Sequence, residues 1–257
     1  MKEKAKKGVI SISKIQHIGR REEQQDNLGV FHKKNSQNGK MEMLAVVADG
    51  MGGLANGSEV SGVVVEAAKY YFMNTEFEEE KSAGMTKMVQ SINKDVLRFL
   101  RQSTGGELSG STMVAAYVCG RKLHFVSVGD SRIYLFRNDM LLQLNREHVH
   151  LRELYRVRDI DELSYEDIMS NREKFALTSY MGIGELDEID YNIEPISLKT
   201  GDKLLLLSDG VFGTLSEREM TEICKLNVGI VENLKDSVLL KNKPTQDNLT
   251  VVLLEFL

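Results

Sequence analysis

The sequence predicts an α+β fold made mostly of antiparallel strands, and three features support this prediction. Apolar runs of strand length gather in blocks, helical patterns gather in other blocks, and the chain lacks the regular strand–helix alternation of a parallel sheet. The 257 residues include only two prolines, and no Gly/Ser-rich stretch or fixed repeat divides them. We therefore expect one domain over residues 1–257.

Each expected element follows from its side-chain pattern. Strands are expected where apolar residues alternate or run together, at residues 8–18, 27–32, 42–48, 111–118, 122–128, 132–136, 140–144, 191–198, 203–208 and 248–256. Helices are expected where apolar residues recur every three or four positions, at residues 57–73, 85–100, 217–226 and 229–240. The four runs between 111 and 144 are separated by short turns and predict an antiparallel meander. Residues 149–180 are polar and helix-prone, which indicates an insertion.

Composition and charge limit the class of protein. Apolar residues make up 42% of the chain and charged residues 28%, and the formal net charge is -5. No basic face is evident, so we expect no nucleic-acid partner. No apolar run is long enough to span a bilayer or to form a signal peptide, so we expect a cytoplasmic protein without a membrane partner. The two cysteines lie outside any C-x-x-C motif, which favours free buried thiols.

Aspartates recur at the ends of apolar strands, beside glycines. The segments LAVVADGMGG, FVSVGDSR and LLLLSDGVFG contain the pairs Asp49-Gly50, Gly129-Asp130 and Asp209-Gly210. Two further aspartates stand directly before expected strands, at Asp26 and Asp247. A single Asp-Gly pair is usually a turn. Strand ends on one rim of a sheet converge, however, so the five carboxylates are expected to meet.

A cluster of carboxylates favours a metal site. Like charges raise one another's pKa unless a cation neutralises them, and oxygen ligands without cysteine suit Mg²⁺ or Mn²⁺. The neighbouring glycines would let a backbone carbonyl or a water approach the ion. We interpret the cluster as a site for a pair of ions with a bridging water. Arg21, close before Asp26, is either a bidentate phosphate ligand or a surface residue.

Six motifs give the chain a resemblance to the metal-dependent protein phosphatases, also called protein phosphatase type 2C, of the bacterial type. The resemblance covers nearly the whole chain, and the motifs stand in family order. They are Arg21-Glu22-Glu23-Gln24-Gln25-Asp26, Asp49-Gly50-Met51-Gly52-Gly53, Gly110-Ser111-Thr112, Val128-Gly129-Asp130-Ser131-Arg132, Ser208-Asp209-Gly210-Val211 and Asp247-Asn248-Leu249-Thr250.

The resemblance implies two antiparallel sheets packed as a sandwich with helices outside. It also implies a centre of two Mn²⁺ or Mg²⁺ ions and a third, weaker ion. Asp49 would bridge the first two ions, and Asp209 and Asp247 would complete the ligands of the first. The Gly50 carbonyl would bind the second ion, and Asp130, together with Asp209, would hold the third.

The resemblance further implies the reaction. A metal-bound hydroxide would attack the phosphorus of phosphoserine or phosphothreonine in a protein, while Arg21 grips the phosphate and Asp26 orients metal-bound waters. The enzyme would oppose a Ser/Thr protein kinase, and we expect it to be a monomer. Residues 149–181 lie where bacterial members carry a flap.

The chain departs from the family pattern at several positions. Gln24 replaces the usual asparagine, and Gln25 stands where many members have glutamate. Met51 occupies the place of a histidine that animal-type members carry as a proposed general acid, so the leaving group must take its proton from another source. Glu147-His148 replaces the usual Asp-His pair, and we expect a surface or structural role for this histidine.

Two other functions fit the same residues. A protein of this fold could bind a phosphoprotein as a regulatory module without turnover, although the intact aspartates argue against it. A phosphatase acting on a small phosphorylated metabolite is the other alternative. Ser111-Thr112 is not accompanied by a histidine-bearing triad, so we interpret it as hydrogen bonding at a strand start and not as a nucleophile.

Overall fold

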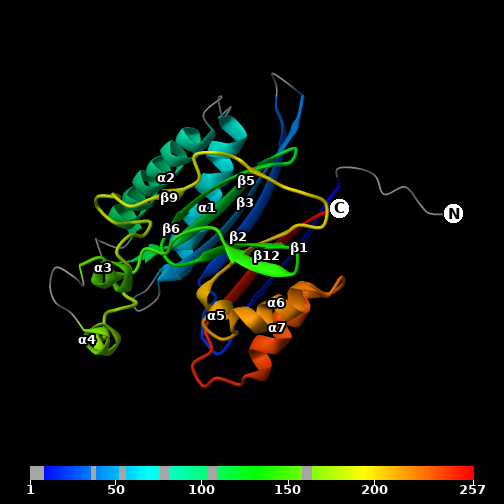
Figure 1. Cartoon of the computed structure of the whole chain (residues 1–257). Helices are drawn as coiled ribbons and strands as arrows, with labels where there is room; N and C mark the ends of the chain where they lie inside the picture. The colour runs from blue at the N-terminus through cyan, green and yellow to red at the C-terminus, as the bar shows by residue number, and fades with distance from the viewer. Residues whose placement is uncertain (1–8, 36–38, 52–55, 76–80, 104–108, 158–163) are drawn as a thin grey trace.

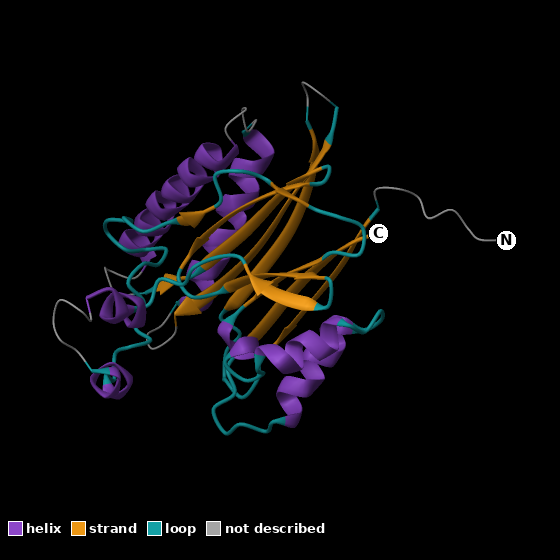
Figure 2. Cartoon of the chain, viewed as in Figure 1, coloured by secondary structure: helices purple, strands orange, loops and turns teal. Residues whose placement is uncertain are grey.

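The protein forms two antiparallel sheets that lie face to face, with helices on the outer face of each (Figure 1). The structure is a computed structural model and describes residues 9–35, 39–51, 56–75, 81–103, 109–157 and 164–257. The strands occupy the middle of the molecule and the helices its sides (Figure 2). This arrangement confirms the predicted α+β class and the sandwich that the resemblance implied.

The strands divide between a five-stranded and a seven-stranded sheet. The first sheet consists, in spatial order, of β1 (Ile10–His17), β12 (Leu249–Phe256), β11 (Lys203–Leu207), β7 (Arg132–Arg137) and β8 (Met140–Gln143). The main path of the second consists of β10 (Ile196–Ser197), β6 (Lys122–Val128), β5 (Met113–Cys119), β3 (Met41–Met51) and β2 (Asp26–Lys34). Two short strands extend it, with β4 (Gly110–Ser111) beside β3 and β9 (Asp190–Tyr191) beside β6.

The helices form the outer layers. The second sheet is covered by α1 (Gly57–Asn74) and α2 (Lys81–Ser103), and the first by α6 (Glu217–Cys224) and α7 (Ile230–Leu240) (Figure 1). Two short helices, α3 (His150–Val157) and α4 (Tyr165–Ser170), lie in the predicted insertion. One short helix that the sequence did not predict, α5 (Asp209–Phe212), follows β11 directly.

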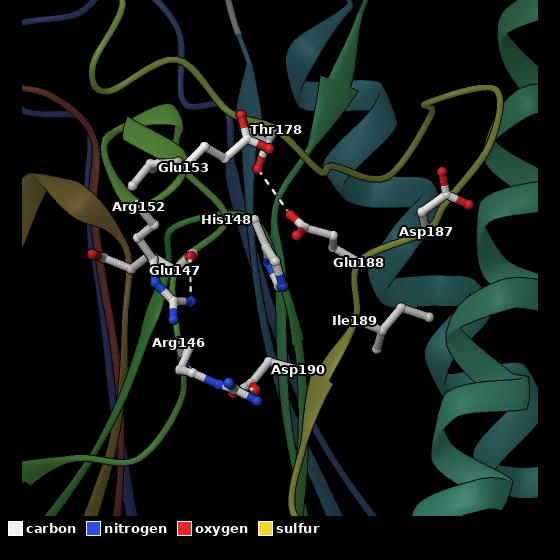
Figure 3. A pocket seen from close by; sticks show the side chains of 11 residues that line it. Arg146, Glu147, His148, Arg152, Glu153, Thr178, Asp187, Glu188, Ile189 and Asp190 are labelled. Carbon is white, nitrogen blue, oxygen red and sulfur yellow. Dashed lines mark hydrogen bonds and ion pairs between the residues drawn. The ribbon is translucent and has the colours of Figure 1, made fainter. Parts of the chain in front are cut away.

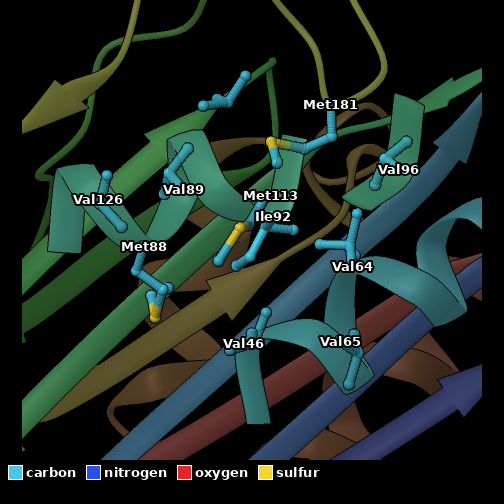
Figure 4. Close-up of a cluster of buried hydrophobic side chains, with 14 of the residues drawn as sticks. Val46, Val64, Val65, Met88, Val89, Ile92, Val96, Met113, Val126 and Met181 are labelled. Atoms are coloured by element: carbon cyan, nitrogen blue, oxygen red, sulfur yellow. The ribbon is translucent and has the colours of Figure 1, made fainter. Parts of the chain in front are cut away.

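The central strands are buried on both faces, which explains their nearly continuous apolar runs. In β3, Val46 packs in the layer under α1 and α2, whereas Val47 packs between the sheets. In β12, Val252 packs between the sheets and Val251 packs against the layer under α6 and α7. Figure 4 shows part of the apolar layer under α1 and α2, including Val46 and Ile92. Three apolar layers therefore hold the strand ends in fixed positions.

The predicted meander over residues 111–144 is wrong at its centre. The pairs β5–β6 and β7–β8 are antiparallel hairpins, but β6 and β7 belong to different sheets. The tight turns at Gly120 and at Asn138-Asp139 take positive φ values, as two-residue hairpin turns require. The turn at Gly129 also has positive φ, 95°, yet it carries the chain across to the other sheet. Spacing alone could not distinguish these turns.

The single strand predicted at residues 191–198 is also wrong, because it is interrupted. Its two short pieces, β9 and β10, both pair with β6. Between them the Asn192 side chain accepts from the Phe125 N–H at 2.6 Å and donates to the Leu123 carbonyl at 3.1 Å, so it takes the place of strand backbone. Pro195 lacks an N–H and cannot continue the ladder.

Some sequence-based predictions remain untested. Gly52-Gly53 of the second motif and residues 158–163 of the predicted flap lie outside the described residues. The single domain and the flap at 149–181 stay predictions. Within the described ranges, no helix combines the length and the apolar character needed to cross a membrane.

Candidate active site

A pocket of about 160 Å³ is lined by residues from both sheets. Its walls are Arg21, Gln25, Asp49, Gly50, Met51, Thr112, Asp130, Leu177, Asp209 and Asp247. These include every predicted site residue except Asp26, which stands directly opposite Asp49 in the β2–β3 pairing. The structure thus brings together all seven residues that the sequence singled out.

Strand ends place the carboxylates around this pocket. Asp49 lies near the end of β3, and Asp130 follows β6 after one glycine. Asp209 opens α5 at the end of β11, and Asp247 stands just before β12. The ends of β3 and β6 lie at one rim of the seven-stranded sheet, because both strands are antiparallel to β5. The end of β11 and the start of β12 lie at one rim of the five-stranded sheet, and the two rims meet at the pocket.

Burial and mutual repulsion raise the pKa values of these carboxyl groups. Burial, followed by the charges of the surrounding aspartates, raises the pKa of Asp49 well above its ordinary range. The same causes raise the pKa of Asp209 to about 7. Burial and then the charge of Glu147 raise the pKa of Asp130 to about 6. Burial also raises the pKa of Asp26, although a hydrogen bond from Ser208 acts in the opposite direction. Arg21 supplies positive charge at this pocket, through its ion pair with Asp247, but it does not balance the aspartates.

The donor set fits divalent cations. The Oδ1 atoms of Asp26 and Asp209 are buried and have no hydrogen-bond partner among the described residues, and buried carboxylate oxygens are normally paired. No three acidic, histidine or cysteine side chains of the described residues stand close enough together to share one ion. Asp247 instead bonds Arg21 at 2.6 Å. The all-oxygen character and the excess negative charge suit Mn²⁺ or Mg²⁺.

The Gly-Ser-Thr motif fixes the backbone that carries Asp49. The Ser111 hydroxyl donates to the Asp49 carbonyl at 3.0 Å, and the Thr112 N–H donates to the same carbonyl at 2.8 Å. The Asp49 N–H in turn donates to the Thr112 hydroxyl at 3.1 Å. Both residues are buried. These contacts agree with the predicted hydrogen-bonding role.

Two motif glycines are required because backbones approach closely. A Cβ atom on Gly210 would lie 1.9 Å from the Asn248 carbonyl oxygen, and one on Gly50 would lie 2.2 Å from the Gly57 carbonyl oxygen. Neither position needs positive φ. Steric contact with neighbouring backbone is therefore one reason for glycine here, besides the access to an ion that the sequence suggested.

The first motif is tied to the last strand. The Asn248 side chain accepts from the Gln25 N–H at 2.7 Å and donates to the Ile18 carbonyl at 2.8 Å. The side chain of Gln24, which replaces the usual asparagine, accepts from the Asp26 N–H at 3.0 Å. Arg21 leaves 48% of its side chain exposed at the pocket. The loop that presents Arg21 is thus anchored while the guanidinium stays accessible.

Sequence reasoning missed one supporting side chain, Ser208, and found no partner for a second, His148. Ser208 is fully buried, donates to Asp26 Oδ2 at 2.7 Å and accepts from the Thr250 N–H at 2.9 Å. His148 is buried, and its Nδ1 accepts from the Gly129 N–H at 3.1 Å. Ser208 stands inside a quoted motif next to Asp209, which was the available signal. For His148, the sequence predicted a surface or structural role and identified no partner.

The sandwich fold and its carboxylate-rich pocket define a class of protein, the metal-dependent phosphatases. A family model described as protein phosphatase 2C matches residues 15–249. The serine/threonine phosphatase stp of Listeria innocua is 33% identical over 239 residues, which cover 91% of each chain. This chain therefore belongs to the protein phosphatase 2C family and is an enzyme, as the six motifs predicted.

Solved structures agree with the family. A serine/threonine phosphatase of S. agalactiae is 27% identical with a TM-score of 0.82, and the match covers 97% of this chain and 100% of that one. The catalytic domain of the serine/threonine protein phosphatase PstP, solved in complex with two manganese ions, is 22% identical with a TM-score of 0.74, and the match covers 96% of this chain and 97% of that one. The second likeness supports the fold alone.

Proposed function

We propose that this phosphatase hydrolyses phosphoserine and phosphothreonine in proteins at a centre of two divalent ions. The observation that carries this proposal is the convergence of aspartates from both sheets on one pocket that also contains an exposed arginine. Carboxylates with raised pKa values need cations, and a guanidinium is suited to phosphate oxygens.

The aspartates around the pocket would hold the ions. We assign Asp49 to both ions, Asp209 and Asp247 to the first, and the Gly50 carbonyl to the second. Asp130, with Asp209, would hold a third, weaker ion. When bound, Mn²⁺ or Mg²⁺ supplies Lewis-acid charge and lowers the pKa of a water molecule to near neutrality.

Arg21 and Asp26 would act on the substrate and on water. The Arg21 guanidinium now bonds Asp247 Oδ2 at 2.6 Å. Arg21 would hold two phosphate oxygens of the substrate with its planar guanidinium. The buried Oδ1 of Asp26 lacks a donor among the described residues and can accept a hydrogen bond from water at the pocket, while Ser208 holds Oδ2.

The biological setting is also a proposal. Relatives such as the stp protein of Listeria innocua are named serine/threonine phosphatases, which supports phosphorylated proteins as substrates over small metabolites. We propose that the enzyme works in the cytoplasm against a Ser/Thr protein kinase, and that it is a monomer.

Metal titration tests the proposal. Metal-stripped protein is mixed with a phosphothreonine peptide, and phosphate release is followed as Mn²⁺ is added. We expect no turnover without metal, saturable activation by Mn²⁺, and near-complete loss of activity in Asp209→Asn. The control variant Asp236→Asn changes an exposed carboxylate on α7 and should keep full activity.

Two results would contradict the proposal. Wild-type protein that binds Mn²⁺ by calorimetry but releases no phosphate would favour the binding-module alternative. A higher kcat/KM on small phosphorylated metabolites than on phosphopeptides would favour the metabolite phosphatase.

A further inference from the structure

We infer that a second pocket, beside the carboxylate cluster, binds a basic side chain of the phosphoprotein substrate. The inference rests on the proposed function, because it assigns a specificity-determining site to the same reaction. This second pocket has a volume of about 300 Å³ (Figure 3), against about 160 Å³ for the pocket that contains the aspartates.

The two pockets are neighbours in the structure. Leu177 lines the pocket of the aspartates, and the next residue, Thr178, lines the second pocket. Val149, on the second pocket, forms a β-bridge with Leu177. A peptide whose phosphorylated residue lies at the aspartates can therefore place a flanking side chain in the second pocket, since extended chain advances about 3.3 Å per residue.

Part of the charge in the second pocket is neutralised within the protein. Five carboxylates and two guanidinium groups line it. Arg146 bonds Asp190 at 2.8 Å, and Glu147 bonds Arg132, which stands outside the pocket, at 2.5 Å. These two carboxylates are matched by arginines and leave no charge for a ligand.

The remaining charge is negative. Asp187 and Glu188 form no ion pair with any described residue, and Glu188 only accepts from the Thr178 hydroxyl, at 3.1 Å. Glu153 contacts the His150 ring, whose charge depends on protonation. Arg152 donates to the Glu147 carbonyl and offsets one negative charge. A lysine or arginine side chain of the substrate would neutralise the negative charge that remains at Asp187 and Glu188.

A largely buried histidine, with one ring nitrogen that has no partner among the described residues, also points to a ligand here. His148 is 7% exposed and lines the second pocket, among the side chains drawn in Figure 3. The Gly129 N–H lies 3.1 Å from Nδ1 and the Gly129 carbonyl lies 3.2 Å from the same atom, so Nδ1 is paired with Gly129 in either tautomer. Nε2 forms no hydrogen bond with a described residue and can donate to a main-chain carbonyl or accept from a main-chain N–H of a bound peptide. The pocket therefore offers contacts to backbone and to a basic side chain.

Peptide scanning tests the inference. A phosphothreonine peptide with alanine at all flanking positions is compared with peptides in which one arginine occupies each flanking position in turn, using the Mn²⁺-loaded enzyme. We expect one position at which arginine raises kcat/KM roughly fivefold, the upper range for a partly exposed ion pair, mainly through a lower KM. Raising the salt concentration should shrink the preference.

Two isosteric variants provide the discriminating result. Glu188→Gln and Asp187→Asn should each reduce the arginine preference while kcat on the all-alanine peptide stays unchanged. The control Glu66→Gln, on the exposed face of α1, should keep the full preference. His148 is left intact because its ring also holds Gly129.

Equal kcat/KM for every peptide, with activity present, would overturn the inference and leave the proposed function standing. A preference that survives both pocket variants would overturn it as well. Absence of turnover on all peptides would instead defeat the proposed function, and the inference would fall with it.

Discussion

Asp209 is a residue whose place in the site lowers the stability of the folded protein. Its pKa rises from 3.8 to about 7 through burial and then the neighbouring aspartates. The folded state therefore binds this proton more tightly than the unfolded state, so the stability from this group is complete below pH 3.8 and is lost as the pH rises to about 7. A neutral amide at this position would avoid that loss.

We expect metal-free Asp209→Asn to melt at a higher temperature than metal-free wild type at neutral pH. The advantage should shrink on acidification towards about pH 5, where the wild-type carboxyl is largely protonated. Thermal melting in chelator measures both effects, and comparing the two proteins cancels the titration of the histidines. Added Mn²⁺ should reverse the order, because the wild type binds the ion more tightly than the variant, which lacks one carboxylate ligand. A variant less stable than wild type at both pH values would contradict this prediction.

Ser208 is a second residue whose role can be measured. Its hydroxyl bridges Asp26 Oδ2 and the Thr250 N–H at 2.7 and 2.9 Å, and it is fully buried. Ser208→Ala leaves the buried Thr250 N–H without its partner and removes one hydrogen bond from Asp26, so the free energy of unfolding should fall by about 1–3 kcal/mol. Urea denaturation checks this value. Ser197→Ala, which removes an exposed hydroxyl that contacts Lys122, should cost under about 0.5 kcal/mol, and an equal loss in both variants would refute the argument.

Among the elements, α5 depends most on one glycine. The helix carries Asp209 and packs against the start of β12, where a Cβ on Gly210 would lie 1.9 Å from the Asn248 carbonyl oxygen. Gly210→Ala must push α5 away from β12, which should destabilise the protein by about 2 kcal/mol or more and abolish activity as Asp209 moves. Gly184→Ala, with nothing within 4 Å of the new Cβ, should be nearly neutral. Activity and melting temperature measure both.

For strands and helices, local sequence patterns predicted where each element lies but not which strands pair with one another. The run at 122–128 coincides with β6, and the helical patterns gave α1, α2, α6 and α7 with ends shifted by a few residues. The meander failed because no local signal tells that Gly129 sends the chain to the other sheet. The short helix α5 escaped because four residues are too few for a helical period.

Across the whole molecule, the sequence predicted which residues meet but not what holds them. The aspartates were found because each follows or precedes an apolar strand, and strand rims converge. The second pocket and the His148 contact to Gly129 could not be predicted, because they depend on how residues 146–153 and 177–190 fold back on the sheet. Such contacts are set by tertiary packing, which no local spacing encodes.

The site also joins the two sheets, and this has a consequence for global unfolding. Asp49 belongs to the seven-stranded sheet, whereas Asp209 and Asp247 flank strands of the five-stranded sheet. Ions held by all three would bind only while the sheets stay docked. Their binding free energy therefore adds to the stability of both sheets at once, about 2.7 kcal/mol at a free metal concentration one hundred times Kd.

We therefore expect Mn²⁺ to raise the hydrogen-exchange protection of amides in β3 and in β11 by the same factor. Both strands have a hydrogen-bonded neighbour on each side, so we expect their amides to exchange through global unfolding. The increase should be largely lost in Asp247→Asn, whose remaining ligands bind Mn²⁺ more weakly. Protection that rises in one sheet alone would mean that the ions are held within that sheet, and the assignment of Asp49, Asp209 and Asp247 to one centre would then be wrong.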